Sequence, residues 1–165
     1  FGEMFLATPD EITSEIEELS SLGVDPVETP MSWVDFGHLL RSKNTTLKNF
    51  LTDQSMIAGI GNIYADEILF DAGLRYDRET SSLTTQEIRR LYRSLVEILH
   101  EAIKYNGSTL SDGQYVDLFG KAGDFQSHHQ VYDREKEPCR RCRRNDIVKT
   151  KVASRSTYYC EVCQV

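Results

Sequence analysis

The first forty residues of the chain contain no lysine and no arginine, although they hold nine aspartates and glutamates. Cysteine is absent before Cys139, and no apolar run approaches the roughly 18 residues that a membrane-spanning helix requires. A secretory signal pattern is also missing. We therefore expect no membrane span, and no oxidising compartment of the kind in which disulfide scaffolds form.

The formal net charge of −7 conceals an uneven distribution of charge along the chain. Residues 1–40 have a net charge of −9, residues 41–129 carry ten basic and twelve acidic side chains, and residues 130–165 carry nine basic and five acidic ones. The local charge of a surface, more than the total, determines whether that surface can approach a polyanion. The basic C-terminal segment is therefore a candidate for binding nucleic acid.

The length of 165 residues suits one ordinary domain or two small ones. A hydrophobic fraction of 39% is enough for a real core. The chain begins with phenylalanine in place of methionine, so we expect it to be a piece of a longer protein.

Apolar spacing and capping residues predict five helices, over about residues 8–23, 32–40, 45–54, 59–74 and 84–107. Thr8 with Glu11 and Thr84 with Glu87 have the spacing of capping boxes, and Gly73 suits a helix end. One face of the last and longest helix is apolar and should be core: Ile88, Leu91, Leu95, Ile98, Leu99, Ala102 and Ile103.

The remainder of the chain predicts a loop and short strands. Residues 108–126 are rich in glycine, serine, aspartate and aromatics, which indicates a long loop of the kind that is usually functional or disordered. The stretches "HHQVYDRE" and "DIVKTKVASRSTYYC" carry alternating and β-branched residues that are typical of short strands.

The four cysteines form two C-x2-C pairs separated by seventeen residues, a spacing typical of a tetrahedral zinc site. Two disulfides are the alternative, but a chain without a secretory signal favours metal. Four protein ligands close the site, so the zinc should be structural, and they leave no ligand position for the nearby His128 and His129.

The stretch "AGIGNIYADEIL" begins with a glycine turn that leads into the fourth predicted helix. Two glycines one residue apart permit either a plain tight turn or the close approach of backbone N–H groups to a phosphate. The pattern is shared with helix–hairpin–helix DNA modules. A basic zinc module further along the chain favours the phosphate interpretation.

Three separate stretches together resemble the C-terminal half of the formamidopyrimidine-DNA glycosylases, in that family's order: "LKNFLTDQSMIAGIGNIYADEILFDAGL", "GDFQSHHQVYDREKEPCRRC" and "SRSTYYCEVCQ". These glycosylases are bacterial base-excision repair enzymes that remove oxidised purines such as 8-oxoguanine. The resemblance implies a mainly α fold, in which a helix–two-turns–helix bundle is followed by a small four-cysteine zinc β-hairpin.

The resemblance also implies a division of the chain and a missing part. Residues 1–30 would be a remnant of the N-terminal domain with a helix, residues 31–126 the helix–two-turns–helix domain with its lesion loop, and residues 127–165 the zinc finger. The family's N-terminal β-sandwich carries a proline nucleophile that forms a Schiff base, and neither that proline nor the participating lysine is in this chain. We expect the full-length protein to be a glycosylase and AP lyase, and this chain alone to be inactive.

Site residues follow from the resemblance position by position. One structural Zn²⁺ would be bound by Cys139, Cys142, Cys160 and Cys163. Arg155 matches the hairpin arginine that binds phosphates beside the lesion and donates a proton in the second elimination. The other implied DNA contacts are Phe1 as a base-stack wedge, Lys43, Lys48, Asn62, Tyr132 and Lys149 or Lys151.

The implied partner is double-stranded DNA with a damaged base or abasic site, bound by a monomer in the bacterial cytoplasm at the nucleoid, with no membrane partner. The chain departs from the family pattern at three positions. Asp133 and Arg143 stand where glycine is usual, and Ser111 stands where arginine is common in the loop that caps the flipped base.

Two other hypotheses remain open. An endonuclease VIII-like enzyme would act on oxidised pyrimidines, although the long loop and "GDFQ" favour the purine branch. A non-catalytic zinc-ribbon module with a helical partner-binding domain would bind DNA without preferring damage.

Overall fold

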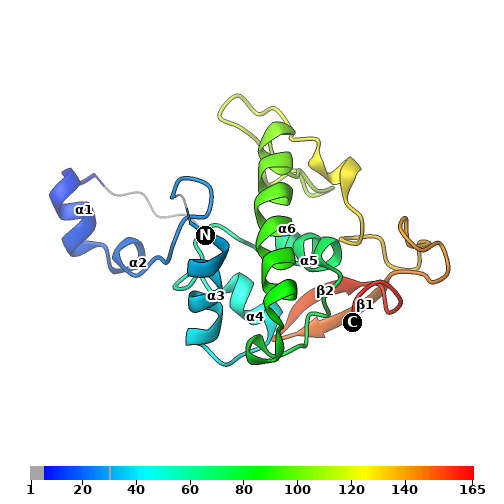
Figure 1. The fold of residues 1–165 in the computed structure, drawn as a ribbon. Coiled ribbons are helices and arrows are strands. Elements are labelled where there is room, and N and C mark those ends of the chain that lie inside the picture. Colours follow the sequence, from blue (N-terminus) through cyan, green and yellow to red (C-terminus); the bar gives the residue numbers. More distant parts are fainter. Residues whose placement is uncertain (1–5, 30) are drawn as a thin grey trace.

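The computed structural model describes residues 6–29 and 31–165. In this part of the chain, a buried helix packs against two other helices and against a single two-stranded hairpin at the C-terminal end (Figure 1). The helices are α1 (Pro9–Glu15), α2 (Glu17–Ser20), α3 (Trp33–Ser42), α4 (Leu47–Thr52), α5 (Asn62–Ala72) and α6 (Thr85–Lys104), with 3-10 turns η1 (Thr80–Ser82) and η2 (Phe125–His128). The strands are β1 (Val148–Val152) and β2 (Arg155–Tyr159). The expected mainly α fold with a C-terminal hairpin is confirmed.

The N-terminal region contains two short helices where one was expected. The Thr8–Glu11 capping box starts α1 as predicted, but Ile16 is extended, with φ −99° and ψ 92°, and ends it. The sequence offers a reason, because this stretch has repeated glutamates and neither α1 nor α2 has a basic residue in its last turn. Figure 1 shows both helices lying apart from the main body.

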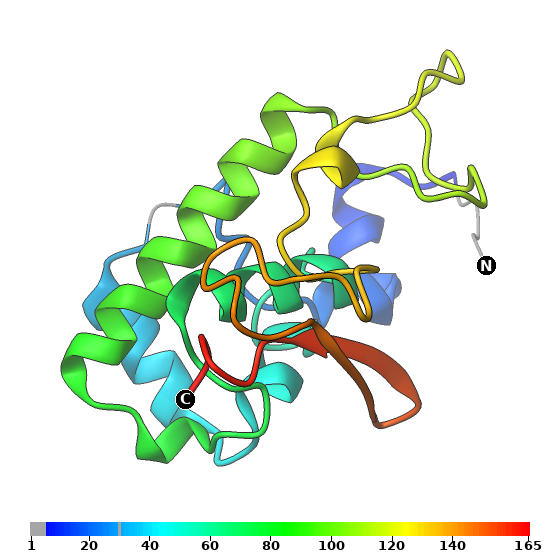
Figure 2. The ribbon, with the colours of Figure 1, turned by 90° about the vertical axis from the view of Figure 1, so that its right-hand side faces the viewer.

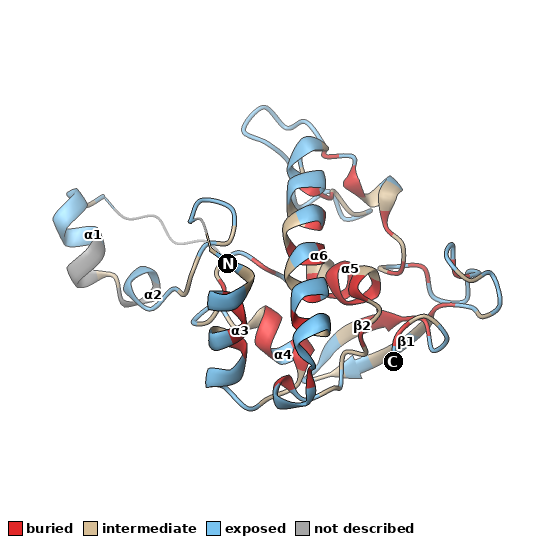
Figure 3. Cartoon of the chain, viewed as in Figure 1, coloured by how far each residue is buried: buried red, intermediate tan, exposed pale blue. Residues whose placement is uncertain are grey.

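The main core lies between α3, α4, α5 and α6. Capping boxes at Ser32 and Thr84 start α3 and α6, and Gly73, with φ 67°, ends α5 in the left-handed conformation that glycine favours. Helix α5 packs against α6 and is buried along most of its length (Figure 3). The predicted apolar face of α6 is buried apart from Leu99, which is partly buried, and Ile103 at its end, which is 55% exposed.

The long loop over residues 108–126 is confirmed, and both of its ends are tied together. The Thr109 N–H donates to Gln126 Oε1 over 2.9 Å, and the Gly123 N–H donates to Thr109 Oγ1 over 2.8 Å. Gly123 lies so close to the chain opposite that an added Cβ would be 2.2 Å from the Gly107 carbonyl oxygen. The loop therefore has a fixed base and an exposed tip, where Leu118 and Phe119 are almost fully exposed.

The prediction of a strand over "HHQVYDRE" is wrong. Its first residue, His128, is the last residue of η2, and the rest is irregular, with Glu135 in an isolated bridge to Ile147. The reason is that the backbone N–H groups of residues 130–132 bond to the carboxylate of Glu67 on α5, so they are not available to a neighbouring strand.

The hairpin of β1 and β2 agrees with the prediction. Val152 pairs with Arg155 across a two-residue turn in which Ala153 and Ser154 have φ of 47° and 68°, the signature of a type I′ turn. A small second core joins the hairpin to α5 through buried Phe70, Val131, Cys139, Ile147, Tyr158 and Cys160. Figure 2 shows the hairpin tip and the long loop projecting from the same side of the helical body.

Two of the positions where the resembling family usually has glycine have left-handed backbone here. Asp133 has φ 59° and Arg143 has φ 53°. A side chain in this conformation costs about 1 kcal/mol relative to glycine, and aspartate tolerates it better than arginine does. The conformation explains the glycine preference without reference to DNA.

Candidate zinc site and nucleic-acid interface

The four cysteine sulfurs lie within 4.8 Å of one another. The Cys139 and Cys163 sulfurs are 3.7 Å apart, as are those of Cys142 and Cys160. A tetrahedron with zinc–sulfur bonds of about 2.3 Å has ligand separations of about 3.8 Å, so this geometry fits one Zn²⁺. It does not fit disulfides, whose sulfurs are about 2 Å apart.

The first knuckle stabilises thiolate through its backbone. Hydrogen bonds from the backbone N–H groups of Arg144 and Asn145 lower the pKa of Cys142, and burial raises it. The hydrogen bonds dominate, and the pKa falls to about 6. Burial, with neighbouring thiols, raises the pKa of Cys163 to about 12. One thiol in the cluster is therefore ready to ionise and another is not, so metal binding must release protons.

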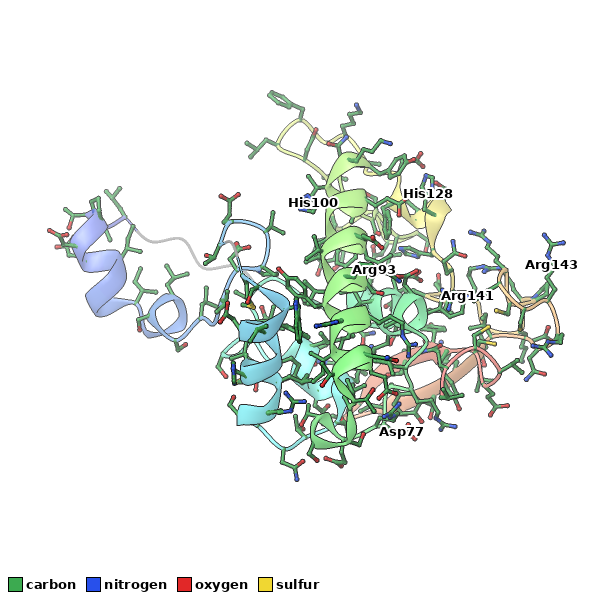
Figure 4. The ribbon with its side chains drawn as sticks, viewed as in Figure 1. Asp77, Arg93, His100, His128, Arg141 and Arg143 are labelled. Atoms are coloured by element: carbon green, nitrogen blue, oxygen red, sulfur yellow. The ribbon has the colours of Figure 1, made fainter. Side chains whose placement is uncertain are left out.

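The arginines around the cysteines do not all serve the same purpose. Arg141 Nη1 donates to the Phe70 carbonyl over 2.8 Å and its guanidinium lies over the Phe70 ring, while Arg140 donates to the His129 carbonyl over 2.8 Å. These two side chains fasten the zinc module to its surroundings. Arg143 instead points outward at the far edge of the cysteine loop (Figure 4).

The glycine turn is held by a residue that the sequence did not single out. Gln54 Oε1 accepts from the Gly59 N–H and Gln54 Nε2 donates to the Ile60 carbonyl, both over 2.9 Å. Gly59 has φ 85°, so its position requires glycine for conformation. The N-cap of α5 is Gly61, which has no side chain that could bond to the first N–H groups of the helix.

Asn62 is the first residue of α5 and faces the hairpin. Its Nδ2 donates to the Ser156 carbonyl of β2 over 2.7 Å, whereas its Oδ1 is buried without a partner among the described residues. Burial raises the pKa of the neighbouring Tyr132, and a bond with Asn62 acts against that rise. The structure thus brings Asn62, Tyr132 and β2 together.

Lys48 lies away from the surface. It is 2% exposed, and its ammonium bonds to Asp66 and to the Asn62 carbonyl, the latter over 3.1 Å. Burial lowers the pKa of Lys48 and raises that of Asp66, so each charge depends on the other. Asp66 also accepts from the Tyr158 N–H over 3.0 Å.

Glu67 is a second buried carboxylate that the sequence did not single out. It accepts from the N–H groups of Gln130 at 2.8 Å, Val131 at 3.0 Å and Tyr132 at 2.8 Å. Burial raises its pKa, and these three bonds oppose that rise. Glu67 therefore fixes the segment that leads from the long loop into the zinc module. An acidic residue inside an apolar helix pattern was the available signal.

The hairpin carries its basic residues on two faces. Cross-strand partners share a face, so Lys149 and Lys151 lie with Tyr158 and Ser156, while Arg155 lies on the other face. Lys149 Nζ lies 5.2 Å from the centre of the Tyr158 ring, as this register requires. Arg155 is exposed directly after the turn.

Two predicted contacts lie elsewhere. The Lys43 ammonium is bonded to Asp53 and its side chain is 47% exposed, so it is on the surface but paired. Phe1 lies outside the described residues.

A cavity of about 600 Å³ opens where these elements meet. The glycine turn lines one side through Gly61 and Asn62, the long loop lines another through Tyr115 and Val116, and Tyr132 closes it. The sequence alone could not predict this cavity, because its walls come from three separate parts of the chain: residues 59–64, 106–117 and 132.

His129 anchors the first residue of the long loop and gives a pH prediction. It is 2% exposed and its Nε2 lies 2.9 Å from the Ser108 hydroxyl. Burial lowers its pKa to about 4, so the unfolded state takes up a proton first as the pH falls below about 6.5. We expect stability to fall by about 2–3 kcal/mol between pH 7 and 4.5 from this residue alone.

Urea unfolding at several pH values measures this effect. His129→Gln should flatten the dependence of the unfolding free energy on pH between 6.5 and 4.5. His100→Gln, which changes an exposed histidine on α6 (Figure 4), is the matched control and should leave it unchanged. Equal slopes for His129→Gln and the unsubstituted chain would contradict the assignment.

Known protein families share both the helical part and the cysteine module. The family model "Formamidopyrimidine-DNA glycosylase H2TH domain" matches residues 22–114, more than half of the chain. The chain belongs to the formamidopyrimidine-DNA glycosylase family. A second model, "Zinc finger found in FPG and IleRS", matches residues 136–165 and agrees with one structural zinc.

Relatives in this glycosylase family match the whole chain. The chain is 41% identical over 165 residues to the formamidopyrimidine-DNA glycosylase of Desulfitobacterium hafniense, covering 100% of this chain and 59% of that protein. For the enzyme of Thermus thermophilus the identity is 45% over 164 residues, covering 99% and 61%. The chain thus spans about three fifths of the length of these relatives and corresponds to their C-terminal part.

Solved structures of formamidopyrimidine-DNA glycosylases share the fold. The crystal structure of MutM (Fpg) from Thermus thermophilus matches with a TM-score of 0.86 at 44% identity, covering 92% of this chain and 57% of that one. Lactococcus lactis Fpg in complex with abasic-site DNA matches with a TM-score of 0.82 at 35% identity, covering 94% and 56%.

Proposed function

We propose that this chain is the DNA-binding part of a base-excision-repair glycosylase and AP lyase that removes oxidised purines. The observation that carries the proposal is the meeting of the glycine turn, the long loop and Tyr132 around one cavity, whose Asn62 is bonded to the zinc-fixed hairpin. In this proposal the chain is a monomer that binds damaged duplex DNA in the bacterial cytoplasm at the nucleoid. The nucleophile that forms the Schiff base lies outside this chain.

Physical chemistry supports a phosphate-binding role for this surface. The start of α5 offers uncapped N–H donors, which favour an anion, and Arg155 stands exposed on a hairpin that the cysteine cluster fixes. An arginine on a rigid support loses little entropy when it makes a paired contact with a phosphate. Tyr132 would add a contact, as would Lys149 and Lys151 on the other face of the hairpin. Arg155 would also donate the proton in the second elimination.

The cavity supports a base-binding role. A damaged base inside a duplex must leave the stack at a cost of a few kcal/mol before chemistry can occur, and bending the strand offsets that cost. A space of about 600 Å³ between the glycine turn and the long loop is large enough for one purine. We propose that residues 108–126 cover the flipped base. We also propose that the chain is divided into an N-terminal remnant over residues 1–30, a helix–two-turns–helix domain over residues 31–126 and a zinc finger over residues 127–165.

Duplex binding by this chain tests the proposal. We expect tighter binding to an abasic analogue than to undamaged duplex, because a missing base removes the cost of extrusion. Arg155→Ala should weaken binding and reduce the slope of log affinity against log salt by about one. Arg93→Ala is the control, since Arg93 is exposed on α6, away from the hairpin (Figure 4).

Three outcomes separate the rival functions. Equal affinity for damaged and undamaged duplex favours a non-catalytic zinc-ribbon module and overturns the proposal. A full-length form that traps with borohydride on oxidised pyrimidines, but not on 8-oxoguanine, favours an endonuclease VIII-like enzyme. This chain alone should not trap, and efficient trapping would mean that the nucleophile lies within it.

A further inference from the structure

Strand β2 has one edge paired with β1 and one edge that β1 cannot reach. In an antiparallel hairpin with a two-residue turn, the pair beside the turn exchanges hydrogen bonds, and the pairs alternate from there. The bonded pairs are therefore Val152 with Arg155, Thr150 with Thr157 and Val148 with Tyr159. The backbone N–H and C=O groups of Ser156 and Tyr158 point away from β1. The edge of β2 that carries these groups is called the outer edge.

Helix α5 provides partners for that outer edge. Asn62 Nδ2 donates to the Ser156 carbonyl over 2.7 Å, and Asp66 Oδ2 accepts from the Tyr158 N–H over 3.0 Å. Asn62 and Asp66 are four residues apart, so they lie on one face of α5, one turn from each other. Their spacing matches the alternation of the strand, and together they hold two consecutive outward-facing residues.

Lys48 completes the arrangement from α4. Its ammonium bonds to Asp66 Oδ1 and to the Asn62 carbonyl, so it reaches both residues that hold the strand. Lys48 and Asp66 are 2% and 1% exposed, which keeps the arrangement out of water. Arg155 is the residue directly before Ser156. Burial lowers the pKa of Lys48, and the positive charge of Arg155 lowers it further.

We propose that Asn62 and Asp66 are positioning residues for Arg155, and that Lys48 holds Asp66 in place for this purpose. This inference rests on the proposed function, because it concerns the placement of the phosphate-binding arginine. It gives Asn62 and Lys48 an action through the hairpin backbone. The bonds to Ser156 and Tyr158 fix the strand on the side where β1 cannot.

Two matched variants isolate the bond to Tyr158. Lys48→Met with Asp66→Asn removes both buried charges and keeps an oxygen that can accept from Tyr158. Lys48→Met with Asp66→Leu removes the same charges at similar volume and leaves no acceptor. Because neither double variant leaves a lone buried charge, the difference between them reports the hydrogen bond and not a folding failure.

Amide hydrogen exchange of this chain, followed residue by residue, is the first readout and needs no DNA. The Leu variant should exchange the Tyr158 N–H about tenfold or more faster than the Asn variant. The Thr157 N–H is bonded to β1 and should keep its protection in both. Equal Tyr158 protection in the two variants overturns the proposal, as does equal loss at Thr157, which would mean that the hairpin itself unfolds.

A mutant cycle with Arg155→Ala on abasic-analogue duplex is the second readout. If Asn62 acts by positioning Arg155, Asn62→Ala should cost at least about threefold less affinity in the Arg155→Ala background than alone. Additive losses mean that Asn62 binds DNA by itself and overturn its positioning role. Failure of the chain to bind any duplex would defeat the proposed function, while hydrogen exchange would still decide the fate of the bond to Tyr158.

Discussion

Cys142→Ser is expected to unfold residues 130–165 while the helical core stays folded. The second core is small, and two of its six buried members, Cys139 and Cys160, are themselves proposed metal ligands. Structural zinc contributes about 10–16 kcal/mol of apparent binding energy to small modules, which is more than so few apolar contacts supply. The main core contains nineteen buried residues, none of which is a cysteine.

Hydrogen exchange and far-UV circular dichroism measure this prediction together. The variant should lose protection in β1, β2 and the segment before them, and retain most helical signal from α3 to α6. Chelation of the unsubstituted chain should do the same, with recovery when Zn²⁺ is restored. Glu161→Gln, an exposed change between Cys160 and Cys163, is the control and should keep full protection. Unchanged protection after the metal is removed would contradict a structural zinc.

Glu67→Ala is expected to release the segment over residues 130–132 from α5. The substitution leaves three backbone N–H groups without their acceptor, at about 1–3 kcal/mol for each group that stays buried. Local opening limits the total, so we expect a loss of about 3–5 kcal/mol in protection, confined to this segment and the zinc module. Few single changes on the exposed surface approach this size.

Urea unfolding and limited proteolysis measure the Glu67 effect. Cleavage should appear near residues 128–135 in Glu67→Ala. Glu97→Ala is the matched control, because Glu97 is 62% exposed on α6 and its carboxylate is 3.7 Å from Arg93, a pair worth about 0.5 kcal/mol or less. If the two glutamate variants lost equal stability, the three N–H bonds would not be holding the segment.

Asp66 and Glu67 explain how one helix organises two other segments. Successive residues of a helix point about 100° apart, so adjacent carboxylates reach different neighbours. Asp66 turns to Lys48 and β2, whereas Glu67 turns to residues 130–132. Both are within the helix that starts at the glycine turn. The turn, the hairpin and the loop leading to it therefore share a single support.

Features that depend on local spacing were predictable from the residues alone. Capping boxes at Thr8 and Thr84, the end of α5 at Gly73, the hairpin over residues 146–160 and the four clustered cysteines were all predicted correctly. Each rests on residues a few positions apart, or on a ligand set that only one geometry satisfies. The family resemblance also came from contiguous motifs.

The polar groups that meet across the fold depend on how distant segments pack. This packing buried Lys48 against Asp66, tied Asn62 to Ser156 and directed three N–H groups to Glu67, so that the expected strand over residues 128–135 did not form. The partners in these bonds are 18, 94 and 64 residues apart along the chain. Local patterns cannot report them, because a buried polar group is satisfied by whichever segment packs beside it, and packing is set by the whole core.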